Sequence, residues 1–403
     1  MRLTPDGVAA MLRPMLDPGQ VPPEVARARA LSALWTFPGI LFSAFIIGWG
    51  AEAAQFLVSR GLALALLAWL QTLPEFAVEA VIAWHRDIPL MTANFTGSLR
   101  LLTGVAWPLI YFTSAWGAKR RGEKNYAVRL HREDAIGIVA LLPPLLYFLV
   151  IWAKSSLTLV DSAILIVLYA AYLWAVSRMP PEELEELSDL PRVSRAALGL
   201  PGVWKGIAVL GLFVGGGLIL YFVAHPFLES MLGLAVSLGV SQFVFVQWVS
   251  PFLSEFPEKV TAFNWARKPG KAPMALMNMV SSNVNQWTVL VAMIPMVYCS
   301  SLGEIAPIPF DQHQRREILL TLAQGFLGFL LLINLRFTWY EAVGLFVLWL
   351  FQFMFPDSHV FVTGVYFAWC GVEIGRGLTG RRPLTAFRVL PELLRTGRLK
   401  DAA

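Results

Sequence analysis

The sequence has few charged residues for its length, and this shortage excludes most soluble folds. Only 15% of its 403 residues are Asp, Glu, Lys or Arg, whereas 57% are hydrophobic. A soluble domain carries roughly a quarter of charged residues. The chain is therefore predicted to be an all-α polytopic membrane protein, with the lipid bilayer as its surroundings. The net charge of +5 is interpreted loop by loop and not as a sign of nucleic-acid binding.

Cysteine and a secretory leader are also lacking. Cys299 and Cys370 are too few for a disulfide framework or a metal cluster. Prolines and charges interrupt the start of the sequence, so residues 1–30 are predicted to form a polar or interfacial tail and not a signal peptide. The sequence contains no phosphate-binding loop, nucleophile elbow or zinc motif, so neither an enzyme nor a resident cofactor is expected.

Apolar runs of about 20 residues, the length needed to cross a bilayer, recur along the chain. In a first repeat, residues 31–177, the predicted spans are 35–58, 61–84, 88–114, 134–153 and 157–177. In a second repeat, residues 203–356, they are 203–225, 231–266, 273–298, 316–334 and 338–355. The acidic, proline-bounded residues 178–202 are predicted to form a hinge loop between the repeats. Residues 357–403 are predicted to hold an eleventh span at 359–374 and a basic tail.

Basic residues between the spans predict how the chain is oriented. They concentrate in the odd-numbered loops, most strongly after the third span, where Lys119, Arg120, Arg121, Lys124, Arg129 and Arg132 lie. Cytoplasmic loops carry the excess of Lys and Arg. The protein is therefore predicted to be a multi-pass protein of the inner (cell) membrane, with its amino terminus outside and the hinge loop cytosolic. The arginines of the amino-terminal tail favour the opposite orientation.

Two stretches of the sequence repeat one another, and each interrupts an apolar run with a proline and a carboxylate. "LQTLPEFAVEAVIAW" (70–84) aligns with "LSEFPEKVTAFNW" (253–265), so the two Pro-Glu pairs coincide. The other matches are Asn94 with Asn278, Ser98 with Ser282, and the capping-box patterns Thr158-x-x-Asp161 with Thr338-x-x-Glu341. Because each repeat has five spans, the two copies must insert with opposite orientations. This predicts the inverted-topology repeats of a secondary transporter.

The Pro-Glu breaks have the chemistry of a cation site. Proline removes an N–H donor and frees carbonyls of the preceding turn, which are tolerated at membrane depth when they line a cavity. Further oxygens are expected from Thr72, Ser98, Ser254, Ser282 and Asn278. Calcium takes about 6–8 oxygen ligands, and two carboxylates neutralise its charge. Glu75 and Glu258 are therefore predicted to bind Ca²⁺ and, on the return step, Na⁺ or protons.

At these residues the sequence resembles the calcium/cation antiporter superfamily, which contains the sodium/calcium exchangers and their bacterial relatives. The resemblance is carried by "QTLPEF" with "ANFTGS" in the first repeat and by "SEFPEK" with "MNMVSSN" in the second. It implies ten spans in two inverted repeats, an extracellular amino terminus and a cytosolic central loop. It also implies that the central carboxylates are Glu75 and Glu258. The neutral groups that it assigns to the site are Thr72, Ser98, Ser254, Ser282, Asn94 and Asn278.

The sequence departs from the family pattern at the same site. The leading glycine of the motif is missing from both repeats, and Leu99 and Leu102 stand where polar residues are usual. The candidates for modulating the charge of the site are Glu79, Arg100, Glu255 and Gln286, and Lys259 is a further addition. Having fewer neutral oxygens indicates fewer bound sodium ions than in a full exchanger.

Arg100 is the least expected of these residues, because it stands inside an apolar span. We expect it to pair with Glu79 or with another acid on a neighbouring helix. The alternative is that its fixed positive charge replaces one co-bound cation.

The sequence as a whole predicts a secondary active antiporter that exports Ca²⁺, or a related divalent cation, in exchange for Na⁺ or protons. Its predicted partners are small inorganic cations and membrane lipid, and its oligomeric state is left open. The alternative is a protein of transporter fold that has lost exchange and acts as a channel, a sensor or a partner subunit.

Overall fold

Helices make up nearly all of the structure, a computed structural model that describes residues 23–396 except 58–68, 124–125, 179–186 and 188–189. In the first half they are α2 (Pro23–Ala54), α4 (Leu73–Trp84), α5 (Ile88–Leu101), the π-helix η1 (Leu102–Ala106), α6 (Trp107–Arg120), α7 (Ala135–Ala140), α8 (Leu142–Lys154) and α9 (Leu159–Ser177). In the second half they are α11 (Trp204–Leu238), α12 (Gln242–Ser254), α13 (Phe256–Arg267), α14 (Ala272–Asn285), the π-helix η3 (Gln286–Leu290), α15 (Val291–Leu302), α16 (Gln312–Leu332) and α17 (Trp339–Met354). The short α10 (Arg192–Leu198) joins the halves, and η4 (Pro356–Ser358), α18 (His359–Leu378) and α19 (Thr385–Thr396) follow them.

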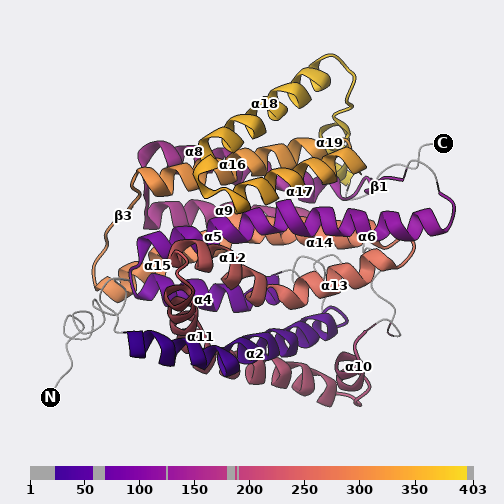
Figure 1. The fold of residues 1–403 in the computed structure, drawn as a ribbon. Helices are drawn as coiled ribbons and strands as arrows, with labels where there is room; N and C mark the ends of the chain where they lie inside the picture. Colours follow the sequence, from indigo (N-terminus) through magenta and orange to yellow (C-terminus); the bar gives the residue numbers. More distant parts are fainter. Residues whose placement is uncertain (1–22, 58–68, 124–125, 179–186, 188–189, 397–403) are drawn as a thin grey trace.

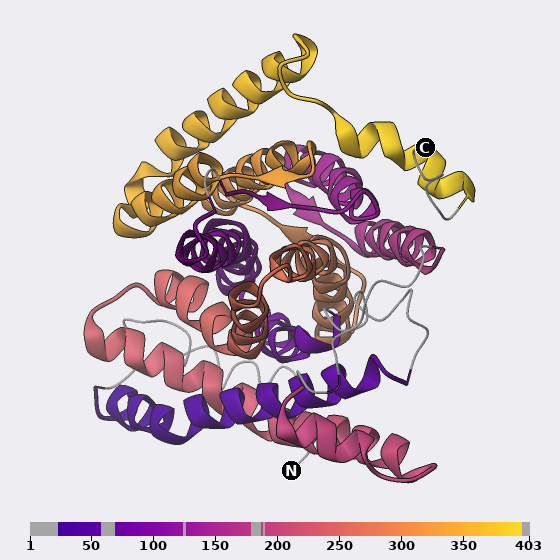
Figure 2. The same ribbon diagram turned by 90° about the vertical axis from the view of Figure 1, so that its right-hand side faces the viewer.

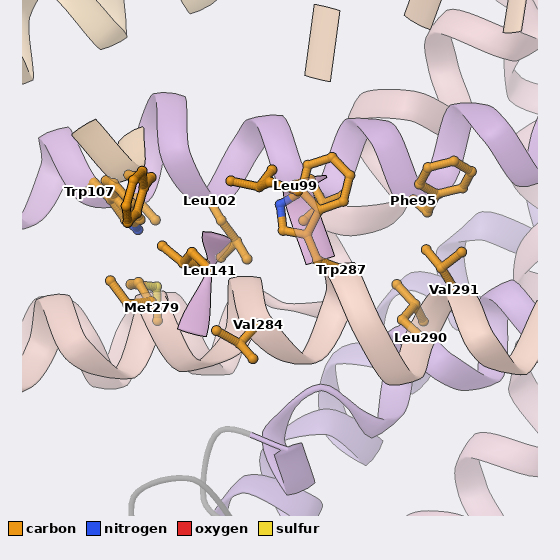
Figure 3. Packing of buried hydrophobic residues seen from close by; sticks show 14 of the residues in the cluster. Phe95, Leu99, Leu102, Trp107, Leu141, Met279, Val284, Trp287, Leu290 and Val291 are labelled. Carbon is orange, nitrogen blue, oxygen red and sulfur yellow. The ribbon is translucent and has the colours of Figure 1, made fainter. Parts of the chain in front are cut away.

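The helices form a bundle whose two halves are interleaved. Figure 1 shows the long helices α2 and α11 side by side along one face, while α18 and α19 lie on the opposite face. The two helices that contain a π-turn, α5–η1–α6 and α14–η3–α15, run antiparallel through the centre and are seen nearly end-on in Figure 2. Their facing sides are apolar, with Phe95 and Trp107 on one helix and Met279 and Val291 on the other (Figure 3). The core of the protein therefore lies between the two repeats.

Two short β-ladders confirm the internal repeat. Strand β1 (Val128–Arg129) pairs antiparallel with β4 (Arg336–Phe337), and β2 (Ser156–Leu157) pairs with β3 (Ile308–Pro309). Each ladder joins a strand of one half to a strand of the other, and the inverted symmetry exchanges the two ladders. The residues that precede β2 and β4, Ser155 and Leu335, both have positive φ (57° and 60°). The ladders also place the third and ninth loops together, as the predicted alternation of odd and even loops requires.

Four helical stretches of the described segments are long and apolar enough to cross a membrane: Glu24–Ala54, Ala135–Lys154 (α7 followed by α8), Leu159–Ser177 and Trp204–Leu238. The predicted spans around the Pro-Glu pairs are each divided by a break or a π-helix, and Trp339–Met354 is apolar but shorter. Interruptions of this kind occur at membrane depth where the backbone is buried in protein or lines a cavity.

The predicted boundary between the sixth and seventh spans, at residues 225–231, is wrong. Helix α11 runs unbroken to Leu238 because the polar residues there face helices and not a loop. The ring of His225 lies against that of His85, tilted by 38° and with 5.0 Å between the centroids, and Ser230 shares a 2.7 Å hydrogen bond with Thr36. The sequence predicted a turn here because it contains polar residues, but these residues lie inside a packed helix interface.

Two further features differ from those predicted. Helix α2 begins at Pro23, twelve residues before the predicted start of the first span, because its first turns pack against α11 (Gly233 lies against Ala26 and Arg29). The remainder of the predicted tail, residues 1–22, lies outside the described residues, as do residues 179–186 and 188–189 of the hinge loop, whose later part contains α10. A helix does occupy the predicted eleventh segment, and a second helix, α19, lies in the segment expected to be a basic tail.

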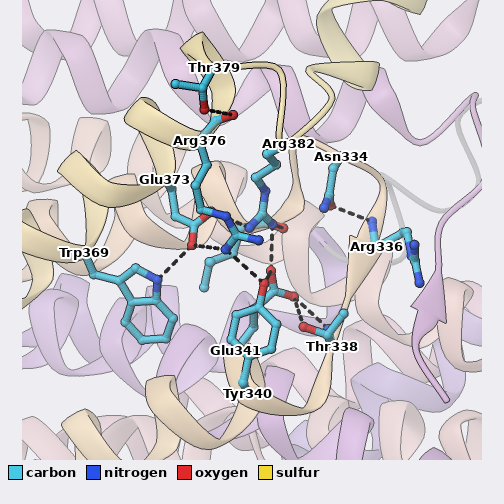
Figure 4. Close-up of polar contacts among 11 residues, drawn as sticks. Asn334, Arg336, Thr338, Tyr340, Glu341, Trp369, Glu373, Arg376, Thr379 and Arg382 are labelled. Atoms are coloured by element: carbon cyan, nitrogen blue, oxygen red, sulfur yellow. Dashed lines mark hydrogen bonds and ion pairs between the residues drawn. The ribbon is translucent and has the colours of Figure 1, made fainter. Parts of the chain in front are cut away.

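Both predicted capping boxes are confirmed, and the second also anchors the carboxyl-terminal helices. Thr158 with Asp161 and Thr338 with Glu341 form reciprocal caps at the starts of α9 and α17. Figure 4 shows Arg382, which is buried, between Glu341 and Glu373, with contacts of 2.7 and 2.6 Å. The helices after the second repeat are thus fixed to it by buried ion pairs.

Gly97 is predicted to be indispensable for the packing of α5 on α12. A Cβ atom added there would lie 1.9 Å from the backbone oxygen of Gln247, which has no freedom to withdraw. We expect Gly97→Ala to lower the free energy of unfolding by at least about 1–3 kcal/mol, seen as a lower thermal midpoint in detergent. Gly215→Ala is the matched control, because nothing lies within 4 Å of its added Cβ. Equal midpoints for the two variants would contradict the close approach.

Candidate functional site

Two helices are interrupted at matching points, each just before a Pro-Glu pair. Thr72 precedes α4, in whose first turn Pro74 lies. Glu255 separates α12 from α13, in whose first turn Pro257 lies. Proline is tolerated in a first turn because the N–H groups there have no helical acceptor. The predicted breaks are confirmed, with each proline starting a new helix.

Glu75 and Glu258 are both fully buried in the first turns of these helices. The amino-terminal end of a helix carries a partial positive charge that favours a carboxylate. The inverted repeat therefore supplies two carboxylates, each supported by its own helix start, at the interface between the halves.

Gln286, the first residue of the π-helix η3, connects the two repeats at this point. Its Nε2 donates to Glu75 Oε2 at 2.7 Å and to Glu255 Oε1 at 2.8 Å. Ser98 Oγ also donates to Glu255 Oε1. Sequence reasoning treated Glu255 and Gln286 as modulators of the site, whereas the structure places both in direct contact with its predicted ligands.

Glu258 has its own set of neighbours from α14 and the first repeat. Ser282 Oγ donates to Glu258 Oε1, and Asn278 Nδ2 lies 3.5 Å from the same oxygen. Asn278 Nδ2 also lies 3.5 Å from Oε1 of Gln71, a buried residue that the sequence did not single out. Gln71 directly precedes Thr72 at the first break, and this position beside the motif could have identified it as a site residue from the sequence.

Several buried oxygen atoms of this cluster have no hydrogen-bond partner among the described residues. They are Glu75 Oε1, Glu258 Oε2, Asn278 Oδ1 and Gln286 Oε1. Buried polar groups in folded proteins are rarely left without a hydrogen-bond partner, so unpaired oxygens such as these indicate a missing partner, for example a bound ion. Two carboxylate and two amide oxygens are hard ligands suited to Ca²⁺ or Na⁺.

Other predicted ligands lie next to the cluster but are engaged elsewhere. The Thr72 hydroxyl donates to Trp69 O at 2.8 Å, and the Ser254 hydroxyl donates to Ser250 O at 3.0 Å. Both hydroxyls thus stabilise the helix ends that precede the breaks. Asn94 Nδ2 donates to Glu79 Oε2 at 2.6 Å.

The suggested pairing of Glu79 with Arg100 is wrong. Glu79 is bound by Asn94, whereas Arg100 Nη2 forms a 2.6 Å ion pair with Glu317 Oε2 on α16. The other expectation for Arg100, a pair with an acid on a neighbouring helix, is confirmed. Sequence reasoning missed Glu317 because its partners Arg100, Gln247 and His359 come from three other helices.

The network around Glu317 ties α5, α12, α17 and α18 to α16. Gln247 Nε2 donates to Glu317 Oε2 at 2.9 Å, and His359 Nδ1 lies 2.8 Å from Glu317 Oε1. Arg100 Nη1 lies 3.4 Å from Gln352 Oε1, and its guanidinium lies 5.0 Å from the centre of a Trp248 ring. The positive charge of Arg100 is therefore satisfied outside the carboxylate cluster.

No group of three or more His, Cys, Asp or Glu side chains in the described part of the chain is placed to hold a metal ion by itself. A cation held at the breaks would have to combine carboxylate oxygens with neutral ones. Such a mixed set suits an ion that is bound and released, and Ca²⁺ accepts it.

The chain matches a known family over both repeats. The profile described as "Sodium/calcium exchanger protein" matches residues 30–178 and 208–356. A crystal structure of the H⁺/Ca²⁺ exchanger CAX is similar over 91% of each chain, with a TM-score of 0.83 and 29% sequence identity.

More distant structures share the fold alone. The sodium-calcium exchanger NCX_Mj, soaked with 2.5 mM Na⁺ and 10 mM Sr²⁺, matches with a TM-score of 0.53 and 18% identity over 83% of this chain and 99% of that one. The same exchanger with 100 mM Na⁺ gives a TM-score of 0.54. Among curated proteins, no significant match is found.

Arg100→Met is predicted to destabilise the protein strongly. Removing one partner of a buried ion pair leaves the other charge uncompensated, which costs about 3–5 kcal/mol of unfolding free energy. Thermal unfolding in detergent measures the loss, and Arg100→Met with Glu317→Gln should recover a large part of it. Arg121→Met is the control, because its pair with Glu123 is exposed and should contribute at most about 1 kcal/mol. If both single variants melt alike, the Arg100 pair does not stabilise the bundle.

Proposed function

The chain belongs to the sodium/calcium exchanger family of membrane cation antiporters, and from this we propose that it exchanges Ca²⁺, or a related divalent cation, for protons. The family consists of transporters and not of enzymes. The proposed ion site lies between the two helix breaks, with Glu75 and Glu258 as its charged ligands.

One observation carries the proposal: unpaired carboxylate oxygens of both glutamates are buried together with unpaired amide oxygens at the interface of the repeats. Asn278 and Gln286 supply those amide oxygens. Ser98 and Ser282 contact the acidic side chains and position them, and they can turn their oxygens toward a bound cation. We assign Thr72, Ser254 and Asn94 to bracing the site, through the helix ends and Glu79.

Protons are favoured over Na⁺ as the counter-ion by the scarcity of neutral oxygens. The family's polar positions are occupied by Leu99 and Leu102 in the first repeat, and both side chains are buried in the apolar core. A sodium ion needs several neutral oxygen ligands, whereas a proton needs only one bond to a carboxylate oxygen. The similarity to the exchanger CAX, which is greater than that to NCX_Mj, points the same way.

Exchange follows if the divalent cation and protons occupy the glutamates alternately. A carboxylate in apolar surroundings is stable when it binds a cation or a proton, and unstable when it does neither. The site must therefore be loaded before the halves rearrange, and this couples the two fluxes. With the odd loops in the cytosol, as the basic residues favour, loading with Ca²⁺ from the hinge side exports it.

A gradient-swap measurement tests the counter-ion. The purified protein is placed in liposomes that contain a calcium indicator, and either a pH gradient or a Na⁺ gradient is imposed. We expect the pH gradient to drive Ca²⁺ movement and a Na⁺ gradient of equal size at constant pH to drive little. Transport driven by Na⁺ alone would overturn the assignment of protons but keep the exchanger.

Glu75→Gln and Glu258→Gln are each predicted to reduce exchange by at least about 100-fold, because each removes a charged ligand and a proton acceptor. Glu79→Gln is the matched control, since Glu79 is a buried glutamate one turn along the same helix that binds Asn94. It should retain most of the activity, because the amide oxygen of glutamine can still accept the hydrogen bond from Asn94. Normal exchange by the Glu75→Gln, Glu258→Gln double variant would refute the site.

A further inference from the structure

A third carboxylate and a lysine lie inside the proposed ion site. Glu255 is fully buried between the two half-helices, where it contacts Gln286 and Ser98. Its second oxygen, Oε2, forms an ion pair with Nζ of Lys259, one turn along α13. Lys259 is itself buried, with 8% of its side chain exposed. Glu255 shares the donor Gln286 Nε2 with Glu75, so these two carboxylates face the same amide group.

The pair is specific to the second repeat. When the two Pro-Glu motifs are superposed, Glu255 corresponds to Thr72 and Lys259 to Phe76. The first repeat therefore has a hydroxyl and an aromatic ring where the second has two opposite charges. The pair adds no net charge, so the site keeps the charge that one divalent cation neutralises.

Helix capping does not account for Glu255. It stands at the position preceding α13, yet its side chain makes no capping hydrogen bond to the backbone there. Both of its oxygens instead point to side chains of the cluster. An ion pair that only stabilised the helix would be expected at its surface, whereas this pair is buried beside Gln286 and Ser98.

We propose that Lys259 is a tethered cation that occupies a monovalent-cation subsite at Glu255 and thereby sets how many charges are exchanged for each divalent ion. The inference rests on the proposed function of the site. The ammonium of Lys259 belongs to the protein and is not exchanged: three carboxylates and one ammonium leave two negative charges. One Ca²⁺ or two protons neutralise them, and no free monovalent cation is needed.

Without the ammonium, Glu255 would be a buried carboxylate with no counter-charge, which apolar surroundings do not tolerate. In the Ca²⁺-free state the site would then take up a third monovalent cation in its place. In the Ca²⁺-bound state the three carboxylates would share the one Ca²⁺ ion, which accepts several carboxylate ligands, so that the third cation is displaced and counts in the exchange. Lys259→Met removes the charge while keeping much of the apolar volume of the side chain. Glu255→Gln removes the carboxylate and leaves the ammonium facing the incoming Ca²⁺.

The stoichiometry of exchange tests the inference in liposomes containing the full chain. The pH gradient that just balances a known Ca²⁺ gradient gives the number of protons per Ca²⁺, with the membrane potential clamped by K⁺ and valinomycin. We expect about two protons in the wild type and about three in Lys259→Met, whose exchange becomes sensitive to potential. Lys259→Met with Glu255→Gln should return to about two. Glu255→Gln alone should weaken Ca²⁺ binding by at least about tenfold.

Lys154→Met is the matched control, because Lys154 also forms an ion pair with a buried acid, Asp161, away from the cluster. Its stoichiometry should equal that of the wild type. If Lys259→Met exchanges the same number of protons as the wild type, or if the double variant does not revert, the tethered-cation role is overturned and the pair is structural.

A binding measurement separates this inference from the proposed function. The thermal midpoint of each purified variant is compared in NaCl and in N-methyl-D-glucamine chloride. Lys259→Met should gain a Na⁺-dependent stabilisation that the wild type and Lys154→Met lack. That gain in a protein that moves no Ca²⁺ would refute the exchange function and retain the subsite, whereas its absence together with an unchanged proton count in an active exchanger would refute the subsite.

Discussion

Burial of negative charge between apolar helices is the constraint on which the rest of this structure depends. Glu75, Glu255 and Glu258 have no contact with solvent, and a carboxylate is stable there only beside compensating charge or hydrogen-bond donors. The fold provides helix starts for two of them and an ammonium for the third. The helix breaks at the two Pro-Glu pairs would weaken an ordinary membrane helix, but they provide the helix starts that stabilise the buried carboxylates of the site.

The inverted repeat builds this site twice, but the two copies are not equivalent. The β-ladders, the capping boxes, the π-helices and the two Pro-Glu pairs obey the symmetry. Two buried basic side chains do not obey it, since Arg100 has its ion-pair partner in the second half and Lys259 has no counterpart in the first. Symmetry therefore fixes the scaffold, and individual side chains fix the charge that the scaffold encloses.

Features encoded within a few residues were predictable from the sequence. The Pro-Glu breaks and the Thr158 and Thr338 caps depend on local chemistry, and the repeat made each prediction twice. The partners of Arg100 were not predictable, because Glu317 lies on another repeat and several acids were equally plausible in sequence. The prediction of a span boundary at residues 225–231 failed for a related reason: His225 is polar, but His85, its neighbour across the interface with α11, is polar too.

The contrast between Leu102 and Gln286 shows how a small difference between the repeats decides the chemistry. Both are the first residues of π-helices, η1 and η3, in the central helices. A π-turn shifts the side chains around it, and such turns are common at functional sites. Only the glutamine can donate one amide group to both Glu75 and Glu255, so it holds carboxylates from the two halves together. The leucine packs in the core, so the amide bridge that Gln286 makes between the repeats has no counterpart at Leu102.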